Sequence, residues 1–299
     1  MIETPQLRDW QASLGGLLLG PGTPYEWMDE LVGFDELPPI RSSDETRPAA
    51  HGDFSGTDFA EGRALEFSLE VAADAGVTFT EALGALDRVL VPNPGPETVP
   101  FWYRLPGKDA RRSEVKVRRR RTHIDRSYEA GLAVVDVQLR APDPLLYGDT
   151  VVAGPTGHPA LAGGLEFDLF TDGADLATGF LEFGDTATTG RLTLSNPGTA
   201  AAWPVFTITG PVPDTGFELV CTTTGRRLRF VGAIATDSVL TIDTSTGSVL
   251  LDQVADRGGR LTVREWFSVP PGGSCEVLFT PLGPTTAATL AATYSPTFW

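Results

Sequence analysis

The chain has 299 residues and a net charge of −16, and 41% of its residues are hydrophobic and 21% charged. This balance is typical of a folded protein with a core and excludes a disordered chain. The length suits two domains of ~100 to 150 residues each. A sequence pI near 4.5 argues against general binding to nucleic acid or to anionic membranes.

Glycine and proline indicate a protein of many strands and turns. The chain has 33 Gly and 24 Pro, about a fifth of all residues against roughly 12% in average proteins. No apolar run reaches the ~18 residues of a membrane span. The N-terminal residues lack the pattern of a secretory signal, so we expect synthesis in a cytoplasm and no membrane association.

The first half begins with a predicted strand, turn and strand over residues 15–28. Residues 37–58 are polar and interrupted by proline and glycine, which predicts a loop or flexible arm. Residues 65–71 alternate apolar and polar side chains, the period of a half-buried strand.

One helix is predicted, over residues 80–90. Leu83, Leu86 and Leu90 recur at three- and four-residue steps and so share one face. Either Thr78 or Thr80 can cap the helix, and the prolines that follow it end it because proline cannot continue the hydrogen-bond ladder.

Further strands are predicted on both sides of a Pro-rich exit at residues 141–148. Residues 101–104, 114–118 and 132–139 precede it and complete a first domain, 1–147. In the second domain, 148–299, short strands recur every 10 to 15 residues, which predicts a β-sandwich without helices. These strands are expected at residues 165–170, 190–195, 205–209, 217–221, 227–230, 239–243, 249–251, 264–269, 274–280 and 287–294.

Residues 108–126 reverse the acidity of the chain. They hold nine Lys or Arg against three acids, a local charge of +6 that leaves −22 for the remainder. The candidate functional strip within them is Lys116, Arg118, Arg119, Arg120 and Arg121. If the segment is a strand, Lys116, Arg118 and Arg120 share one face, and Arg119 and Arg121 share the other with the two valines.

The strip has two interpretations. In the first it is an inter-subunit surface that meets acidic patches of neighbouring rings and gives the assembly its register. In the second it is a solvated edge strand whose charges block unwanted sheet pairing. Nucleic-acid binding is disfavoured, because the aromatic residues of a stacking platform are not interleaved with the charges.

Large apolar residues supply a second set of candidates. We interpret Leu83, Leu86, Trp102, Trp203 and Trp266 as core or interface anchors. The tryptophans have an alternative role, since indole rings also stack on the apolar faces of sugars.

The sequence offers little for catalysis or metal binding, and we expect no cofactor and no enzyme activity. The three histidines, expected on the surface or in loops, are not at zinc-ligand spacing. Residues 168–173 resemble a calcium loop but lack oxygen ligands at its third and twelfth positions. A glycosidase carboxylate pair stays open as a third possibility, because such pairs are defined by their separation in space.

The two cysteines, Cys221 and Cys275, exclude a disulfide framework. We expect two buried thiols, with a single bridge between neighbouring strands as the alternative.

Taken in order, several short features resemble the distal tail protein family of siphophages, which includes minor tail proteins of actinobacterial phages. The resemblance covers nearly the whole chain, and the order and spacing of its elements carry it. In the first half these elements are the turn in residues 15–28, Leu31-Val32-Gly33-Phe34 before a Pro-rich stretch, the single helix, and Asp143-Pro144-Leu145-Leu146-Tyr147. In the second half they are Leu194-Ser195-Asn196-Pro197-Gly198, the run Trp203 to Gly210, Thr224-Gly225, Leu240-Thr241-Ile242-Asp243, Phe267 to Gly272 and the closing Tyr294 to Trp299.

The resemblance implies a mainly β fold, with an N-terminal β-rich ring (belt) domain containing one α-helix and a C-terminal galectin-like β-sandwich. It implies a structural virion protein at the distal end of the tail, in a hexameric ring that joins the tail tube to the tip or baseplate and serves as an assembly hub for host-recognition proteins. Its partners would be further copies of itself, the major tail tube protein, the tape-measure protein and tail-tip proteins. The alternative is a carbohydrate- or receptor-binding module that recognises a host cell-surface glycan through the second domain.

Overall fold

The computed structural model describes residues 4–74, 76–159 and 189–299, which form two compact units. The first unit is Met1–Asp149 with Thr297–Trp299, and the second is Thr150–Pro296. The strand expected at residues 165–170 and the calcium-like loop at 168–173 lie outside the described residues.

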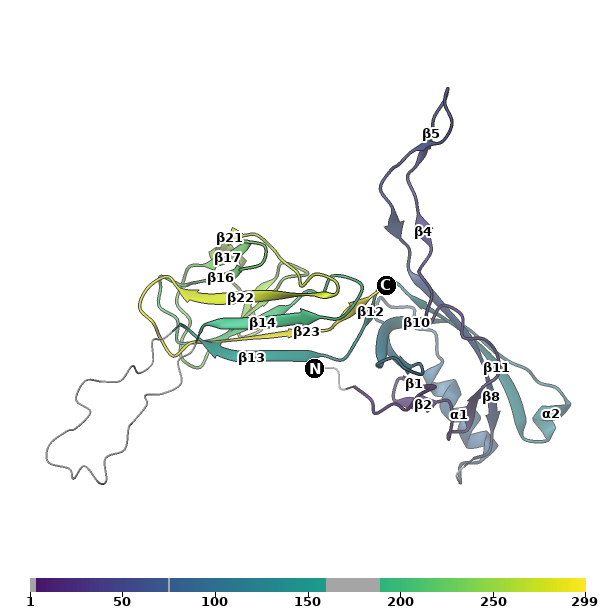
Figure 1. The fold of residues 1–299 in the computed structure, drawn as a ribbon. Coiled ribbons are helices and arrows are strands. Elements are labelled where there is room, and N and C mark those ends of the chain that lie inside the picture. The colour runs from purple at the N-terminus through teal and green to yellow at the C-terminus, as the bar shows by residue number, and fades with distance from the viewer. Residues whose placement is uncertain (1–3, 75, 160–188) are drawn as a thin grey trace, which may run out of the picture. The chain divides into compact units, whose positions relative to one another are not determined.

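The first unit is built on a nine-stranded antiparallel sheet (Figure 1). Seven strands follow the order β2-β1-β9-β10-β11-β8-β3, and β12 joins β10 and carries β24. The strands are β1 (Gln11–Leu14), β2 (Leu17–Leu19), β3 (Tyr25–Trp27), β8 (Arg63–Ala72), β9 (Val99–Arg104), β10 (Arg111–Thr122), β11 (Leu132–Ala141), β12 (Leu146–Tyr147) and β24 (Thr297–Phe298).

The hairpin near the N-terminus turns earlier than the sequence predicted. Gly15 and Gly16 have φ of +56° and +85° and connect β1 to β2, where we expected them to begin a strand. Two positive-φ residues in succession suit a two-residue hairpin loop, and glycine adopts them without strain. Residues 25–27 then pair with β8 and not with β2.

The predicted helix is α1 (Phe79–Val89), and Thr78 is its cap. The Thr78 side chain accepts a hydrogen bond from the Glu81 backbone N–H, and the Glu81 carboxylate accepts one from the Thr78 backbone N–H. This reciprocal pair satisfies two otherwise unpartnered donors of the first turn. A second helix of four residues, α2 (Arg126–Glu129), was not expected.

The sheet of the first unit curves around α1. The helix contacts both β8 and β2, which stand near opposite ends of the strand order, so a flat sheet could not supply both contacts. Ala82 and Leu86 of the helix join a buried cluster with alternate residues of β8, β9 and β11. Five rings, Trp27, Phe34, Phe67, Phe101 and Tyr103, meet within this cluster, most of them edge to face.

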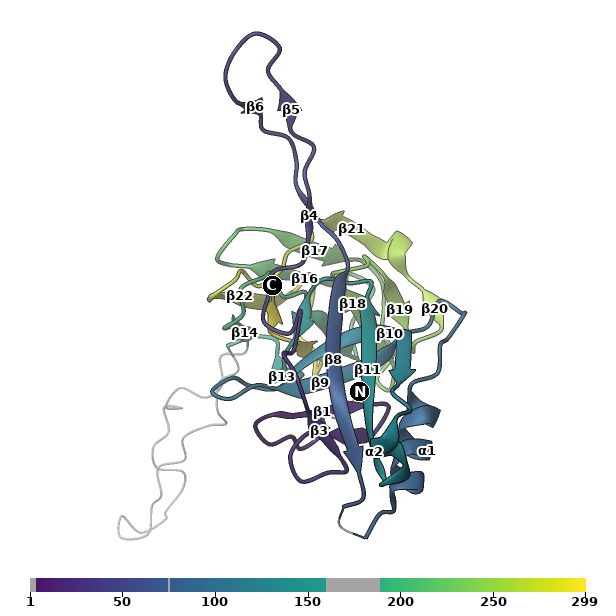
Figure 2. The same ribbon diagram turned by 90° about the vertical axis from the view of Figure 1, so that its right-hand side faces the viewer.

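A long hairpin, which we call the arm (residues 37–62), extends from the sheet of its own unit (Figures 1 and 2). It has two short ladders, β4 (Ile40–Arg41) with β7 (Phe59–Ala60) and β5 (Glu45–Thr46) with β6 (Asp53–Phe54). Every residue from 39 to 59 is exposed. The sequence predicted a loop or arm here without these ladders.

The second unit contains two antiparallel sheets, ordered β13-β23-β15-β18-β19-β20 and β14-β22-β16-β17-β21. The first comprises β13 (Val151–Gly157), β15 (Val205–Thr209), β18 (Val239–Asp243), β19 (Val249–Leu251), β20 (Ala255–Asp256) and β23 (Thr289–Tyr294). The second comprises β14 (Arg191–Asn196), β16 (Phe217–Cys221), β17 (Arg227–Phe230), β21 (Leu261–Arg264) and β22 (Gly273–Pro281).

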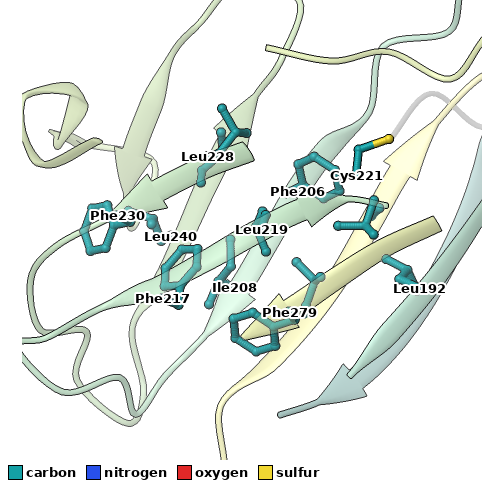
Figure 3. Packing of buried hydrophobic residues seen from close by; sticks show 14 of the residues in the cluster. Leu192, Phe206, Ile208, Phe217, Leu219, Cys221, Leu228, Phe230, Leu240 and Phe279 are labelled. Carbon is teal, nitrogen blue, oxygen red and sulfur yellow. The ribbon is translucent and has the colours of Figure 1, made fainter. Parts of the chain in front are cut away.

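The two sheets of the second unit enclose a single apolar core. Alternate residues of each strand point into it, among them Phe206, Ile208, Phe217, Leu219 and Phe279, all fully buried (Figure 3). Alternation of buried and exposed side chains is what a half-buried strand requires. A face-to-face pair of such sheets forms a sandwich.

These observations confirm the predicted mainly β fold, with small departures. The strand expected at residues 264–269 lies earlier, at β21, and β12, β13, β20 and β24 were not predicted. A 3₁₀ turn, η1 (Gly258–Arg260), occurs in the second unit. Among the described residues no helix combines the length and the apolarity needed to cross a bilayer.

Candidate functional site

The basic strip lies on β10 and changes face along its length. Lys116 and Val117 pair with Arg140 and Leu139 of β11, but Arg119 pairs with Gln138, so Arg118 is an additional residue in a bulge. An inserted residue inverts the alternation beyond it. Arg119 and Arg121 therefore lie opposite Gln138 and Asp136 on the outer face, and Arg120 lies opposite the buried Val137.

The face assignment expected from the sequence is therefore wrong beyond Val117. Arg120 does not share a face with Lys116, and Arg119 and Arg121 do not share one with the valines. Strict alternation fails because the bulge adds one residue to β10 relative to β11.

Individual strip residues have different partners. Lys116 Nζ donates to the carbonyl of Gly95, and Arg120 forms an ion pair with Asp87 of α1. Within the described part of the chain, Arg118, Arg119 and Arg121 form no ion pair, and all three are exposed. The strip thus presents three exposed cationic side chains, of which Arg121 lies opposite Asp136 and helps to lower the pKa of that carboxyl.

The strip also borders a free stretch of sheet edge. β10 pairs with β9 from Arg111 to Val115 on one side, and with β11 from Lys116 to Thr122 on the other. In the residues the structure describes, no strand covers the β9-side edge of β10 beyond Val115. Such an edge offers unpaired backbone groups to another chain.

The predicted anchors of the first unit are mostly buried. Leu86 is 1% exposed and Trp102 is 3% exposed, and Leu83 packs against the same core as Leu86. Trp102 lies on the face of β9 opposite Phe101 and Tyr103, where the guanidinium of Arg112 stands 5.5 Å from its ring. Arg112 also lies 5.7 Å from the ring of Tyr147.

The two tryptophans of the second unit lie at the surface. Trp203 is 43% exposed, and Trp266 packs partly against the core. Both line one shallow hollow of about 670 Å³, together with Thr224, Gly225, Arg226 and Glu265. Trp203 is therefore no core anchor, and the structure brings together two indoles that are 63 residues apart in the sequence.

Local contacts fix the shape of this hollow. Gly247 lies against the indole of Trp266, where an added Cβ would stand 3.3 Å from the ring. The Arg226 guanidinium donates to the Trp266 carbonyl at 2.8 Å. The Glu265 carboxylate accepts from the Arg227 backbone N–H at 3.1 Å. Indoles beside a guanidinium and a carboxylate can stack on a sugar ring and hydrogen-bond its hydroxyls.

The histidines do not form a catalytic or metal-binding group. His123 Nε2 lies 2.8 Å from Asp136 Oδ2, and Ser68 Oγ donates to Asp136 Oδ1 at 3.0 Å. The carboxylate stands between the other two groups, so the histidine cannot act as base toward the serine. The hydrogen bond from His123 is the main cause that lowers the pKa of Asp136. No cluster of three potential metal ligands occurs in residues 4–74, 76–159 and 189–299.

His158 lies in a loop after β13, one of the two expected settings, but it is buried. It is 3% exposed and its ring packs 4.3 Å from that of Phe279. Burial lowers the pKa of this imidazole. The two cysteines are buried free thiols on β16 and β22, with their Sγ atoms 2.6 Å apart.

The arm is the surface that the sequence reasoning did not single out. It carries five acids against two arginines, and four of its apolar side chains are between 52% and 75% exposed: Leu37, Ile40, Phe54 and Phe59. The sequence shows isolated apolar residues, Ile40, Phe54 and Phe59, within an otherwise polar stretch. This surface was not recognised because the run is too irregular for a strand.

The base of the arm is fixed to the sheet. Arg63, 2% exposed, donates to the carbonyls of Gly33, Glu36 and Pro144. Burial is the main cause that lowers the pKa of this guanidinium. Lys108 and Arg111 form ion pairs with Asp35 just before the arm, so the arm leaves the sheet at a defined point.

Comparison with known proteins identifies a related family and a related fold. Residues 197–298 match the family described as "Siphovirus-type tail component, C-terminal domain". A tail component is a structural part of a virion, so the match confirms the expected class of protein, a non-enzymatic component of the siphophage tail.

The fold comparison extends over almost the whole chain. The crystal structure of SPP1 Dit, described as a paradigm of hub adsorption apparatus in phages that infect Gram-positive bacteria, is similar with a TM-score of 0.65 and 14% identity, over 97% of this chain and 99% of that one. With the family match, this likeness confirms the resemblance to siphophage distal tail proteins. Chains of the phage p2 baseplate in its activated conformation, with calcium and with strontium, match at a TM-score of 0.49 and 10% identity over 95% of this chain and 97% of theirs. No curated protein sequence matches the chain.

Proposed function

We propose that the chain is a distal tail subunit that forms a ring between the tail tube and the tail tip and serves as a hub on which the tip assembles. The observation that carries this proposal is the tail-component match of residues 197–298 within a chain whose entire fold is similar to SPP1 Dit. In this role the first unit, residues 1–149 with 297–299, forms the ring, and the galectin-like second unit, residues 150–296, faces outward.

The first unit has the surfaces that a ring subunit needs. A free sheet edge beside exposed arginines and an exposed arm with apolar side chains are both unusual on a monomer, because monomers rarely leave strand edges and apolar groups without a partner. Permanent interfaces bury more than ~2,000 Å² and are apolar at their centre. The proposed partners are further copies in a hexamer, the tail tube protein, the tape-measure protein and tail-tip proteins.

Native mass spectrometry of the full chain, with negative-stain images of the same sample, tests the proposal. A closed ring of about six times the 31.9 kDa chain is expected. A chain that stays monomeric at all concentrations, and that antibody labelling does not locate at the distal end of virion tails, would contradict it.

A second candidate function rests on the hollow at Trp203 and Trp266. Its exposed indoles, Arg226 and Glu265 suit a sugar ligand, so we also propose that the second unit recognises a cell-surface glycan. A glycan array on the full chain tests this, with Trp203→Ala as the variant and Trp10→Ala, at a similarly exposed tryptophan of the first unit, as the control. Saturable binding lost only in the Trp203 variant is expected, and an array without saturable binding contradicts the candidate.

A further inference from the structure

The arm is built to be completed by another chain. Two-residue ladders at its base and tip are all the strand pairing it has, and an isolated two-stranded hairpin is marginally stable in water. Local bonds hold the stretch between the ladders, including Gly56 N–H to Asp44 at 2.7 Å and Ser43 Oγ to the Thr57 carbonyl at 2.7 Å. The arm is thus ordered, although every residue from 39 to 59 faces solvent.

The aromatic residues of the arm are exposed in a defined arrangement. Arg41 stands 5.6 Å from the ring of Phe59, and Arg47 stands 5.1 Å from that of Phe54. Each arginine covers part of one ring, yet both rings stay more than half exposed. An interface that covers the exposed parts of both rings removes apolar surface from water and is stabilised by it.

Charge identifies a receiving surface in the same unit. The arm has a net charge of −3, with Glu45 and Asp53 exposed at its far ladder. The basic strip on β10 presents Arg118, Arg119 and Arg121, which are exposed and form no ion pair in the described residues, although Arg121 acts on Asp136 through its charge. A cationic edge repels the same edge of another copy but attracts an acidic hairpin, so one feature both prevents wrong pairing and selects the right one.

The direction of the arm excludes contact with the strip of its own copy, so the receiving strip belongs to a different copy. The arm leaves beyond Arg63, which pairs with Ala141, whereas Arg119 and Arg121 pair with Gln138 and Asp136 further along the same sheet. The arm extends away from the sheet of its own unit (Figures 1 and 2) and so away from its own strip. With a reach of about 40 Å at ~3.3 Å per residue, it is long enough to cross onto a neighbour.

We propose that the arm of one copy docks along the β10 edge of the next copy, with its acids on Arg118, Arg119 and Arg121 and its aromatic residues packed against the neighbouring surface. This inference rests on the proposed ring function and adds the contact that closes the ring. The fixed base of the arm, with Arg63 bonded to three backbone carbonyls, aims every arm in the same direction. Each copy then gives one arm and receives one, which is a head-to-tail contact that generates a ring when the rotation closes.

A charge exchange in the full-length chain tests the contact. The first variant, Glu45→Arg with Asp53→Arg, reverses the charge at the far ladder of the arm. The second, Arg119→Glu with Arg121→Glu, reverses the charge of the strip. The third carries all four changes. All four side chains are exposed, so folding should be unaffected, and equal melting temperatures check this. Two control variants make the same charge changes at other exposed positions. Asp109→Arg with Glu129→Arg matches the arm variant, and Arg8→Glu with Arg257→Glu matches the strip variant.

The readout is the concentration at which half of the chain is in rings, by native mass spectrometry at two salt concentrations. Each double reversal should raise it at least about tenfold, and the fourfold exchange should return it to within about threefold of the unaltered chain. The controls should leave it unchanged. Reversals that leave assembly unchanged, or an exchange that does not restore it, overturn the arm contact and leave the ring function intact. An unaltered chain that forms no ring, in solution or in virions, overturns both.

Discussion

Phenylalanine side chains are buried in the sandwich of the second unit but exposed in the arm of the first unit. Phe206, Phe217 and Phe279 are 0% exposed in the sandwich, whereas Phe54 and Phe59 in the arm are 57% and 52% exposed. Burial within a chain stabilises that chain, but an exposed ring can contribute only when a second molecule covers it. The sandwich core therefore stabilises the fold of its own chain, whereas the aromatic residues of the arm can contribute only in an interface.

The largest effect expected is a matched pair of alanine substitutions. Phe279→Ala should lower the free energy of unfolding of the full chain by about 3 to 5 kcal/mol, because it leaves a cavity in a closed core. Phe54→Ala should lower it by less than about 0.5 kcal/mol, because its ring is already in solvent. Denaturant titration followed by fluorescence measures both, and equal losses would break the contrast.

The next effect concerns the boundary between core and arm. Arg63→Met should destabilise the chain by about 3 kcal/mol, since it removes the donor of one buried and two partly buried carbonyls. Hydrogen exchange should also rise in residues 33–36, which Arg63 holds at the start of the arm. Lys108→Met, at a more exposed ion pair, is the control and should cost no more than about 1 kcal/mol. Protection of residues 33–36 that survives Arg63→Met would remove the argument for a fixed base.

A smaller effect tests the end of the helix that supports the sheet. Thr78→Ala should cost about 1 kcal/mol because it removes the capping bond to Glu81. Thr80→Ala, within the first turn, should change stability by only a few tenths of a kcal/mol or increase it. Thermal unfolding of the two variants decides between the two caps that the sequence allowed, and a larger loss at Thr80 would contradict the structure.

The smallest effect is a pH dependence in the first unit. The pKa of Asp136 is lowered, chiefly by the hydrogen bond with His123, so its ionised form favours the folded state. This contribution is complete well above the ordinary aspartate pKa of 3.8 and is lost as the pH falls through the lower folded-state value. Asp136→Asn should therefore flatten the acid limb of a stability-against-pH curve below about pH 5. An unchanged acid limb would show that other carboxylates account for it.

Local patterns were sufficient to predict most of the regular structure. Residues 65–71 alternate cleanly because β8 has one face on the core, and Leu83 and Leu86 mark α1 because one side of that helix is buried. The sequence allowed two capping threonines, and only Thr78 has an acid three positions later that can form the reciprocal bonds. The resemblance to siphophage distal tail proteins followed from the order and spacing of short turns and strands along nearly the whole chain.

Features decided by distant residues could not be predicted in this way. The bulge at Arg118 depends on how β10 and β11 register, and it reverses the direction of the next three arginines. Trp203 and Trp266 meet only after the sandwich has formed, so the sequence suggested core or interface anchors, or sugar-stacking rings, but could not place both residues in one hollow. The ladders of the arm are two residues long, which is below the length at which a periodic pattern can be recognised.

The last strand, β24, returns the chain to the sheet of the first unit. Leu146 and Tyr147 of β12 pair with Phe298 and Thr297 of β24, so the points where the chain leaves the first unit and returns to it are neighbours in one sheet. The second unit is therefore an insertion into the first, tethered at both ends. During translation the sheet of the first unit stays one strand short until the whole insertion has been synthesised. For engineering, residues 150–296 form a cassette whose replacement leaves the β12–β24 pair in place, whereas truncation at residue 149 removes the closing strand of the unit it was meant to isolate.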